Sequence, residues 1–242
     1  MPELPEVQTT VNDLNKKIKG LIITGVWTDW PKYFGRDFKR EAVGRKIEKV
    51  WRIGKNIIFD LSGGKKMLIH QKMTGHLLVG AWSRRHGAWV AAEKGLLSEK
   101  INGYIHVMFY LSGGKMMGLS DVRKFAKLLV VDKKNFQNLK DIKDIGPDPL
   151  LPSFKFSEFK KLITKKRGAV KKILMDQSVI SGIGNIYSDE ILFVAGIHPL
   201  KKVENLKGAE LRKIFNAVKK VLRRAVELRG ASISDYRDAA GK

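Results

Sequence analysis

The hydrophobic pattern of the chain changes its period once, and this change most constrains the fold. Up to about residue 132, short β-branched and aromatic segments alternate with glycine-containing turns, which is typical of β-strands. Beyond residue 154, apolar residues recur at helical spacing. The stretch between them is polar and then proline-rich, like a linker. The sequence therefore predicts an α+β protein with a β-rich domain at 1–132, a linker at 133–154 and a helical domain at 155–242.

The β-rich domain is expected to begin with a helix. Four apolar residues recur at helical spacing near the start of the chain: Val7, Val11, Leu14 and Ile18. A short amphipathic helix is therefore expected over residues 5–19, with a proline in its first turn. Seven strand-like segments follow: "LIITGVW", "KIEKVWRI", "NIIFDL", "KMLIHQ", "YIHVMFYL", "KMMGLSD" and "KLLVVD". The tetrad "LSGG" before lysine occurs at 61–65 and 111–115, which predicts two hairpins whose glycines adopt positive φ.

Four helices are expected in the C-terminal domain. Ser157 is expected to cap a helix over "EFKKLI", and a second helix is expected around residues 169–174. The third spans 186–195, and the fourth is long and strongly basic over 206–228. A ligand is expected to bind between this domain and the β-rich one.

Charge indicates the class of that ligand. The chain has 47 Lys and Arg against 24 Asp and Glu, a formal net charge of +23. The excess is shared almost equally between the two halves of the sequence, so it is not a detachable basic tail. A positive field over both domains favours a polyanion held between them, and nucleic acid is the commonest such partner. A membrane surface is disfavoured, because no segment combines a basic face with a bare apolar one.

The absence of cysteine excludes other classes of chemistry. Disulfides, thiolate nucleophiles and thiolate metal ligands cannot form within a chain that has none. No apolar run approaches the roughly 18 residues of a membrane span, and the N-terminus lacks the layout of a signal peptide. We therefore expect a cytoplasmic protein, and we assign no metal ligand.

The opening "MPELPEV" places a nucleophile and a proton carrier side by side. Removal of Met1 would leave Pro2 as a secondary amine, and α-amino groups titrate near neutrality, with a pKa of about 7.7 to 8. Attack on a sugar aldehyde carbon would give an iminium that keeps its charge and acidifies the neighbouring carbon. Glu3 can shuttle protons beside it, and Glu6, one turn away, can hold the amine in place.

A purely structural role is the alternative for this opening. Pro2 and Pro5 would then stiffen an N-terminal arm, and the glutamates would favour the positive end of the first helix. The first residues alone do not exclude this alternative, so other segments decide.

Five segments together resemble the bacterial formamidopyrimidine-DNA glycosylase family, whose relatives include the endonuclease VIII group. They are "MPELPEV", "RIGKNIIF", "IHQKMTG", "SDVRKFA" and "LMDQSVISGIGNIYSDEILFVAGIHP", and the same order continues to "SISDYRDAAGK". Leu4 resembles the formamidopyrimidine branch. The resemblance implies an N-terminal β-sandwich with a leading helix and a C-terminal helical domain containing a helix-two-turns-helix element.

The resemblance also implies the catalytic residues. Pro2 would be the Schiff-base nucleophile and Glu3 the proton donor, with Glu6 beside them. Lys55, in "RIGKNIIF", resembles the family lysine that touches a DNA phosphate near the lesion and assists elimination. Its alternative is a solvated lysine on a strand.

The DNA-binding residues implied by the resemblance lie in both domains. His70 and Lys171 resemble family contacts to DNA, although His70 can also be read as a packed side chain. Asn185 opens a helix whose free N–H groups and positive dipole end would suit a phosphate.

A wedge is implied by three further residues. Met73, Arg123 and Phe125 match the side chains that the family inserts where the damaged nucleotide leaves the stack. Met73 and Phe125 can also be read as core residues, but both stand in turn-like segments, which favours exposure.

The implied function is base-excision repair. The expected enzyme is a DNA glycosylase with abasic-site lyase activity that excises oxidised purines, such as 8-oxoguanine and formamidopyrimidines, from damaged double-stranded DNA. It would act as a nucleoid-associated monomer. The alternatives are a non-catalytic or degenerate homologue that still binds damaged DNA, and an RNA-binding or ribosome-associated protein that uses the same helical element.

The end of the chain departs from the family pattern. Family members usually continue into a four-cysteine zinc finger, whereas this sequence stops at Lys242 and has no cysteine. No cofactor is therefore expected in this chain, and either truncation or a natural lack of the finger accounts for the difference.

Binding at matched ionic strength separates the nucleic-acid hypotheses. We expect tighter binding to a duplex DNA with an abasic site than to structured RNA, measured by fluorescence anisotropy at several salt concentrations. Salt must be matched because each neutralised phosphate steepens the log–log salt dependence by about 0.9. Tighter binding to the RNA at every salt concentration would favour the ribosome-associated alternative.

Overall fold

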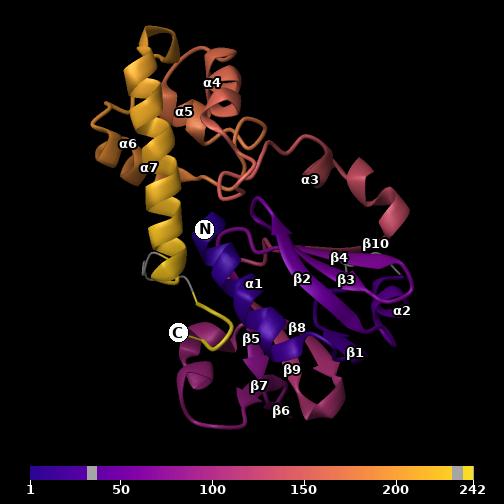
Figure 1. Ribbon diagram of the computed structural model, residues 1–242. Helices are drawn as coiled ribbons and strands as arrows, with labels where there is room; N and C mark the ends of the chain where they lie inside the picture. The colour runs from indigo at the N-terminus through magenta and orange to yellow at the C-terminus, as the bar shows by residue number, and fades with distance from the viewer. Residues whose placement is uncertain (32–36, 231–236, 242) are drawn as a thin grey trace.

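The computed structural model describes residues 1–31, 37–230 and 237–241 (Figure 1). Part of the segment "SISDYRDAAGK", residues 232–236, and Lys242 lie outside these ranges. The strands are β1 (Ile23–Thr28), β2 (Ile47–Ile53), β3 (Asn56–Leu61), β4 (Lys65–His70), β5 (Gly75–Gly80), β6 (Trp82–Arg85), β7 (Ala88–Ala91), β8 (Ile105–Leu111), β9 (Met116–Asp121) and β10 (Lys127–Asp132). The α-helices are α1 (Leu4–Ile18), α2 (Phe38–Ala42), α3 (Lys140–Lys143), α4 (Phe156–Thr164), α5 (Val170–Leu174), α6 (Asn185–Ala195) and α7 (Gly208–Glu227).

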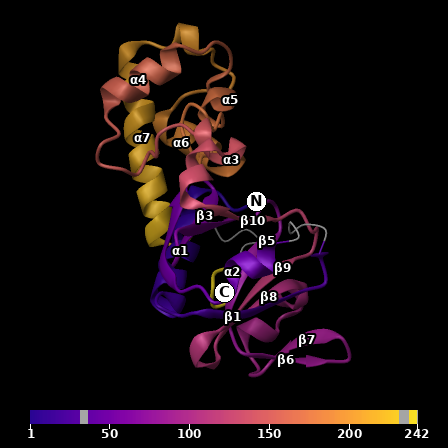
Figure 2. The same ribbon diagram turned by 90° about the vertical axis from the view of Figure 1, so that its right-hand side faces the viewer.

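Two antiparallel four-stranded sheets form the N-terminal domain, in the orders β1-β8-β9-β5 and β10-β4-β3-β2. Apolar side chains from both sheets and from α1 share one buried cluster, which includes Leu14, Phe59 and Phe109. The expected β-sandwich with a leading helix is therefore confirmed. The β6–β7 hairpin lies at the end of the sandwich far from the helical domain (Figure 2).

The two "LSGG" turns form as expected. Residues 61–65 join β3 to β4, and residues 111–115 join β8 to β9, both antiparallel pairs. Gly63 and Gly113 have φ of 72° and 74°, a region that a β-carbon disfavours.

The strands over residues 75–91 were not anticipated from the sequence. Their β5 segment is bounded by Gly75 and Gly80, which look like strand breakers. Both glycines instead permit close approach: a β-carbon on Gly75 would lie 2.4 Å from the Gln71 carbonyl oxygen, and one on Gly80 would lie 2.4 Å from the Leu97 side chain. Glycine here allows tight packing rather than ending the strand.

The segment between the domains packs against the sandwich. Phe136 and Ile142 are buried with Ile58 and Leu68 on the second sheet. Further along, Phe154 is buried in the helical domain. This segment is therefore polar overall, but Phe136 and Ile142 anchor it to the second sheet and Phe154 anchors it to the helical domain.

The helical domain follows the expected order, with a different start for its first helix. The expectation that Ser157 caps α4 is wrong, because the N-cap is Lys155 and Ser157 lies in the first turn. Phe156 stacks on Phe159 and packs edge-on against Phe215, so aromatic packing draws the helix start earlier. Helix α6 ends at Gly196 in the left-handed conformation, with φ of 66°. Among the described residues, no helix is long and apolar enough to cross a membrane.

Leu4 joins the two domains. It begins α1, beside the sandwich, yet its side chain is fully buried in the apolar cluster of the helical domain. Its N–H donates to the carbonyl of Gly182, at 3.0 Å. Gly182 has φ of 90°, and a β-carbon there would lie 2.6 Å from the Leu4 side chain. This close packing places the N-terminus against the turn before α6. In Figure 1 the N-terminal end of the chain accordingly lies on the side of α1 that faces the helical domain.

Leu4→Ala is expected to lower the free energy of unfolding by about 2–5 kcal/mol, because it removes a fully buried side chain and leaves a cavity. Urea unfolding followed by circular dichroism measures this change. Leu200→Ala is the matched control, since Leu200 is 71% exposed and its truncation should change the free energy by less than about 0.5 kcal/mol. Equal effects of the two variants would contradict the assigned packing.

Candidate active site and DNA interface

Glu3 reaches from the start of the chain to the N-terminus of α6. Its carboxylate accepts the N–H groups of Gly184, Ile186 and Tyr187, at 2.6, 2.9 and 3.3 Å. The residue is only 2% exposed. A helix N-terminus carries unpaired N–H donors and a partial positive charge, so it stabilises the ionised form of this buried acid.

Glu6 fixes the backbone beside Glu3. Its carboxylate accepts the Glu3 N–H at 2.8 Å and the Tyr187 hydroxyl at 2.6 Å. Gly230, with φ of 101°, packs on the same carboxylate, and a β-carbon there would lie 2.8 Å from it. Glu6 thus holds the peptide next to Pro2, and both domains contribute to that grip.

Lys55 meets Glu3 at Gly184. A β-carbon on Gly184 would lie 2.5 Å from the Glu3 carboxyl group and 2.8 Å from Lys55 Nζ, so only glycine fits between them. Lys55 is 7% exposed, which excludes the alternative of a solvated strand lysine.

Burial shifts both titrating groups. It raises the pKa of the Glu3 carboxyl group above its usual value, although the three N–H donors and the Lys55 charge oppose the shift. It lowers the pKa of the Lys55 ammonium group, against the attraction of Glu3 and Glu6. An acid and a base whose pKa values move toward neutrality are suited to proton transfer.

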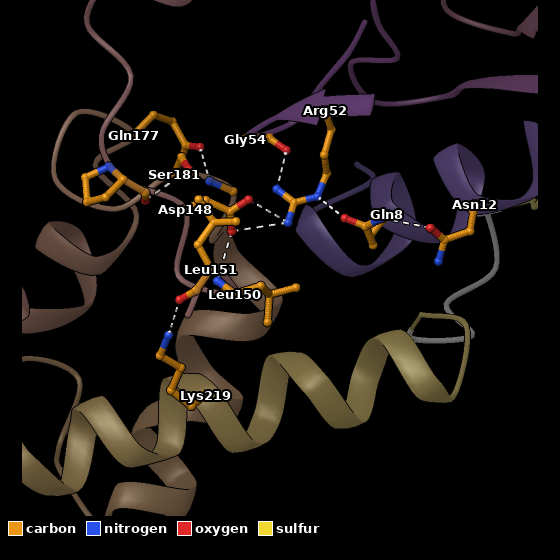
Figure 3. Close-up of polar contacts among 12 residues, drawn as sticks. Gln8, Asn12, Arg52, Gly54, Asp148, Leu150, Leu151, Gln177, Ser181 and Lys219 are labelled. Atoms are coloured by element: carbon orange, nitrogen blue, oxygen red, sulfur yellow. Dashed lines mark hydrogen bonds and ion pairs between the residues drawn. The ribbon is translucent and has the colours of Figure 1, made fainter. Parts of the chain in front are cut away.

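The turn that carries Lys55 is anchored through Arg52 to two other parts of the fold, as Figure 3 shows. Arg52 contacts the Gly54 carbonyl at 3.4 Å, the Asp148 carboxylate at 2.9 Å and the Gln8 side chain at 2.7 Å. Gln8 belongs to α1 and Asp148 to the segment between the domains. The position of Lys55 therefore depends on the way these segments pack together.

A cavity of about 410 Å³ opens beside these groups. Met1, Lys55, His70, Asp176 and Ser178 are among its lining residues. Pro2 is buried next to half-exposed Met1. Volume alone does not single out this cavity, because hollows of about 430 and 500 Å³ lie beside β5 and β7 and between α6 and α7. The adjacent buried acid and base distinguish the cavity at Met1.

His70 presents a neutral donor to this cavity. Its Nδ1 accepts the Lys72 N–H at 2.9 Å, so the proton of the neutral ring is assigned to Nε2. Burial, helped by the charges of Lys72 and Lys55, lowers its pKa to about 4. At neutral pH the ring is uncharged and can donate one hydrogen bond, for example to a phosphate.

Met73, Arg123 and Phe125 lie together on two neighbouring loops. Arg123 Nη1 lies 3.0 Å from Met73 Sδ, and the guanidinium stacks 4.7 Å from the centre of the Phe125 ring. Met73 is 44% and Phe125 50% exposed, so the expected exposure is confirmed and the alternative core placement is wrong. An exposed aromatic and thioether beside a cation can contact nucleic-acid bases.

The helical domain corrects one expectation. Asn185 is exposed at the first position of α6. The prediction that the N–H groups around it are free to bind a phosphate is wrong. Those of Gly184, Ile186 and Tyr187 donate to Glu3. The protein's own carboxylate thus occupies the anion site of this helix.

Lys171 lies apart from this cluster. It stands on α5, where its Nζ lies 2.8 Å from Asp189 of α6. It does not line the cavity at Met1. The structure therefore brings together Pro2, Glu3, Glu6, Lys55 and His70, and it leaves Lys171 at a separate place.

Two residues that shape the site were not selected from the sequence. Tyr187 holds Glu6 through its hydroxyl group. Gln177 holds the turn before α6, since its amide donates to the carbonyls of Met175 and Ile183 and accepts the Gly182 N–H. Both stand inside the long segment "LMDQSVISGIGNIYSDE", but nothing in the spacing shows the direction of their side chains.

The residues present do not fit the zinc site that the family resemblance implied. The chain has no cysteine. Within residues 1–31, 37–230 and 237–241, no group of three or more His, Asp or Glu is placed to hold a metal ion.

Comparisons with known proteins agree on one family. The model of the formamidopyrimidine-DNA glycosylase N-terminal domain matches residues 1–128, and that of the family's H2TH domain matches residues 145–237. Formamidopyrimidine-DNA glycosylases of Herpetosiphon aurantiacus and Enterococcus faecalis are 34% and 35% identical over the whole chain, which covers 84% and 82% of their lengths.

Solved structures are similar over the same extent. The MutM (Fpg) protein of Thermus thermophilus has a TM-score of 0.83 at 30% identity, with 100% of this chain and 83% of that chain covered. The Lactococcus lactis Fpg in complex with abasic-site DNA has a TM-score of 0.84 at 27% identity, with 99% and 84% covered.

Neutral His70 gives the fold an acid-sensitive contribution to stability. Because its folded pKa of about 4 lies below the unfolded value of 6.5, its contribution is complete above pH 6.5 and is lost as pH falls through about 4. The free energy of unfolding should therefore fall less for His70→Gln than for the parent protein between pH 7.5 and pH 4. The difference between the two decreases should be about 3 kcal/mol at most.

Urea unfolding at a series of pH values measures this difference. His70→Asn is a second neutral replacement, and it should flatten the pH dependence in the same way. Parallel curves for the parent protein and both variants would contradict the assigned pKa shift.

Proposed function

The chain belongs to the formamidopyrimidine-DNA glycosylase family, and on that premise we propose that it is a DNA glycosylase of base-excision repair acting on damaged duplex DNA. The observation that carries the proposal is that Glu3 and Lys55 are buried together at the N-terminus of α6, and that Glu3 directly follows Pro2. A structural role for the N-terminal glutamates does not explain why a lysine is buried with them.

The nucleophile is the amine of Pro2. In the translated chain its nitrogen is bonded to Met1, so removal of Met1 is required to free the secondary amine. The nitrogen then bonds to the sugar C1′ as the glycosidic bond breaks. The damaged base leaves with the bonding electrons and takes up the proton that the amine loses. Opening of the sugar ring places a proton on O4′ and leaves a charged iminium.

Glu3 is suited to supply the proton to O4′. Burial raises the pKa of its carboxyl group, which favours the protonated form, and the N–H donors of α6 stabilise the carboxylate once the proton has gone. The iminium then acidifies C2′. Loss of a C2′ proton expels the 3′-phosphate, which gives abasic-site lyase activity by β-elimination.

Lys55 and His70 are suited to hold the sugar–phosphate backbone near the reacting carbon. Lys55 brings a charge and His70 an uncharged donor to the same cavity. The net charge of +23 favours the approach of the polyanion. Met73, Arg123 and Phe125 would fill the space left in the duplex by the extruded nucleotide.

We propose oxidised purines, such as 8-oxoguanine and formamidopyrimidines, as the substrates. Leu4 supports the formamidopyrimidine branch, and a MutM protein solved with carbocyclic 8-oxo-G containing DNA has a TM-score of 0.84 at 28% identity. The enzyme would act as a monomer on nucleoid DNA in the cytoplasm. Its proton transfers use the chain's own side chains, so we propose that this chain binds no cofactor.

Borohydride trapping tests the proposed chemistry. The protein with free Pro2 should give a covalent adduct with an abasic duplex, detected by denaturing electrophoresis. Pro2→Gly, or protein that mass spectrometry shows to retain Met1, should lose the adduct. Glu3→Gln should slow excision of an oxidised purine by about 10²–10⁴-fold, the usual contribution of general acid–base catalysis.

Glu48→Gln is the matched control for the acid, because Glu48 is exposed on β2 and should leave the rate unchanged. Protein with free Pro2 that binds the abasic duplex but gives no adduct at any concentration would support the non-catalytic alternative instead.

A further inference from the structure

A buried carboxylate lies beneath the two loops that carry Met73, Arg123 and Phe125. Asp121 ends β9 and has no exposed surface. Its Oδ2 accepts the N–H of Phe125 at 2.7 Å and that of Ala126 at 2.8 Å. One oxygen of this side chain therefore fixes the backbone of the loop between β9 and β10.

The other oxygen joins that loop to the turn between β4 and β5. Asp121 Oδ1 accepts the Thr74 hydroxyl and, at 3.3 Å, the Arg123 N–H. Thr74 Oγ1 also accepts the Arg123 N–H, at 3.1 Å. Thr74 follows Met73 directly, so these bonds hold together the backbones behind Met73 and Arg123. We call Asp121 and Thr74 the loop clasp.

Both loops need such support. Lys72 and Lys124 each have φ of 55°, in the left-handed region that residues with a β-carbon seldom adopt. A strained conformation persists only where the surrounding structure fixes it. The Lys124 N–H also donates to the Asp121 backbone carbonyl, at 3.2 Å.

The donors to Asp121 show that its carboxylate is matched to this place. A buried charge is costly unless hydrogen bonds surround it. Asp121 receives three backbone N–H groups and one hydroxyl group, all from the two loops. Asparagine would present one oxygen and an NH₂ group, and its NH₂ would face N–H donors.

We propose that Asp121 is a positioning residue that, through Thr74, holds the two loops as one rigid body, so that Met73, Arg123 and Phe125 enter the duplex together. The inference rests on the proposed function. Side chains fixed in advance lose little freedom on insertion, whereas separately mobile loops would have to be ordered at that step. The clasp would therefore speed reactions that need extrusion of a paired nucleotide, and it would leave unpaired substrates unaffected.

Two substrates and one fluorescent probe separate positioning from general stability. One substrate is a duplex with a paired oxidised purine, and the other is a single-stranded oligonucleotide with an abasic site. The probe is 2-aminopurine next to the lesion, which brightens when its neighbour leaves the stack. The variants are Asp121→Asn and Thr74→Val, with Thr74→Ser as the conservative rescue and half-exposed Asp132→Asn, which lies away from both loops, as the matched control.

Asp121→Asn and Thr74→Val should reduce the 2-aminopurine signal on duplex binding and lower kcat/KM for the paired lesion by about 10–100-fold, as expected for lost hydrogen bonds to a charged group. Borohydride trapping on the single strand should stay within about threefold of the parent protein. Thr74→Ser should restore the signal, and Asp132→Asn should not change it.

Two results would overturn the inference. One is an unchanged signal and rate in both clasp variants. The other is an equal loss on both substrates, since that indicates a merely structural role. If Asp121→Asn does not fold, the pair Thr74→Val and Thr74→Ser decides. Failure of the proposed function would appear separately, as a parent protein that gives no trapped adduct, and the fluorescence measurement would still test the clasp.

Discussion

The hydrogen bonds between the Glu3 carboxylate and the N-terminus of α6 are the interaction on which the rest of the site depends. The acid stands at the start of the chain beside the β-sandwich, and its donors are Gly184, Ile186 and Tyr187 of the helical domain. These bonds bury Glu3, which follows Pro2 directly, and they bring Met1 and Lys55 to one cavity. Because acid and donors belong to different domains, a change in domain orientation changes the environment of the proposed proton donor.

The same contact explains why a glycine and hydrogen-bonded side chains surround the site. Gly184 leaves room for the approach of Glu3 and Lys55, and Tyr187 bonds to Glu6. Burial then raises the pKa of Glu3 and lowers that of Lys55, because both groups lose water. The opposite charge beside each of them offsets only part of this shift. Proton-transfer capacity thus follows from packing rather than from an unusual residue type.

Sequence patterns predicted local features well where the cause was local. The "LSGG" turns, the strands that alternate with glycine-containing turns, and the exposure of Met73 and Phe125 all depend on neighbours in the chain. The misses have non-local causes. Strand β5 was missed because Gly80, which ends it, makes room for the distant Leu97 side chain, and α4 begins early because Phe156 packs against Phe215 of α7. The α6 N–H groups looked free because Glu3, their acceptor, lies 181 residues before Gly184 in the sequence.

The sequence by itself determined the two types of domain, the net positive charge of both halves of the chain and the adjacency of Pro2 and Glu3. Periodicity, charge and covalent order are properties of the chain. Only the tertiary structure decided which partner each polar group has. In the folded protein Glu3 accepts hydrogen bonds from α6, Lys55 lies beside Glu3, and Asp121 accepts the Thr74 hydroxyl. The physical reason is that a buried charge takes the donors nearest to it in space, and these proximities arise only when the two domains and the two loops pack together.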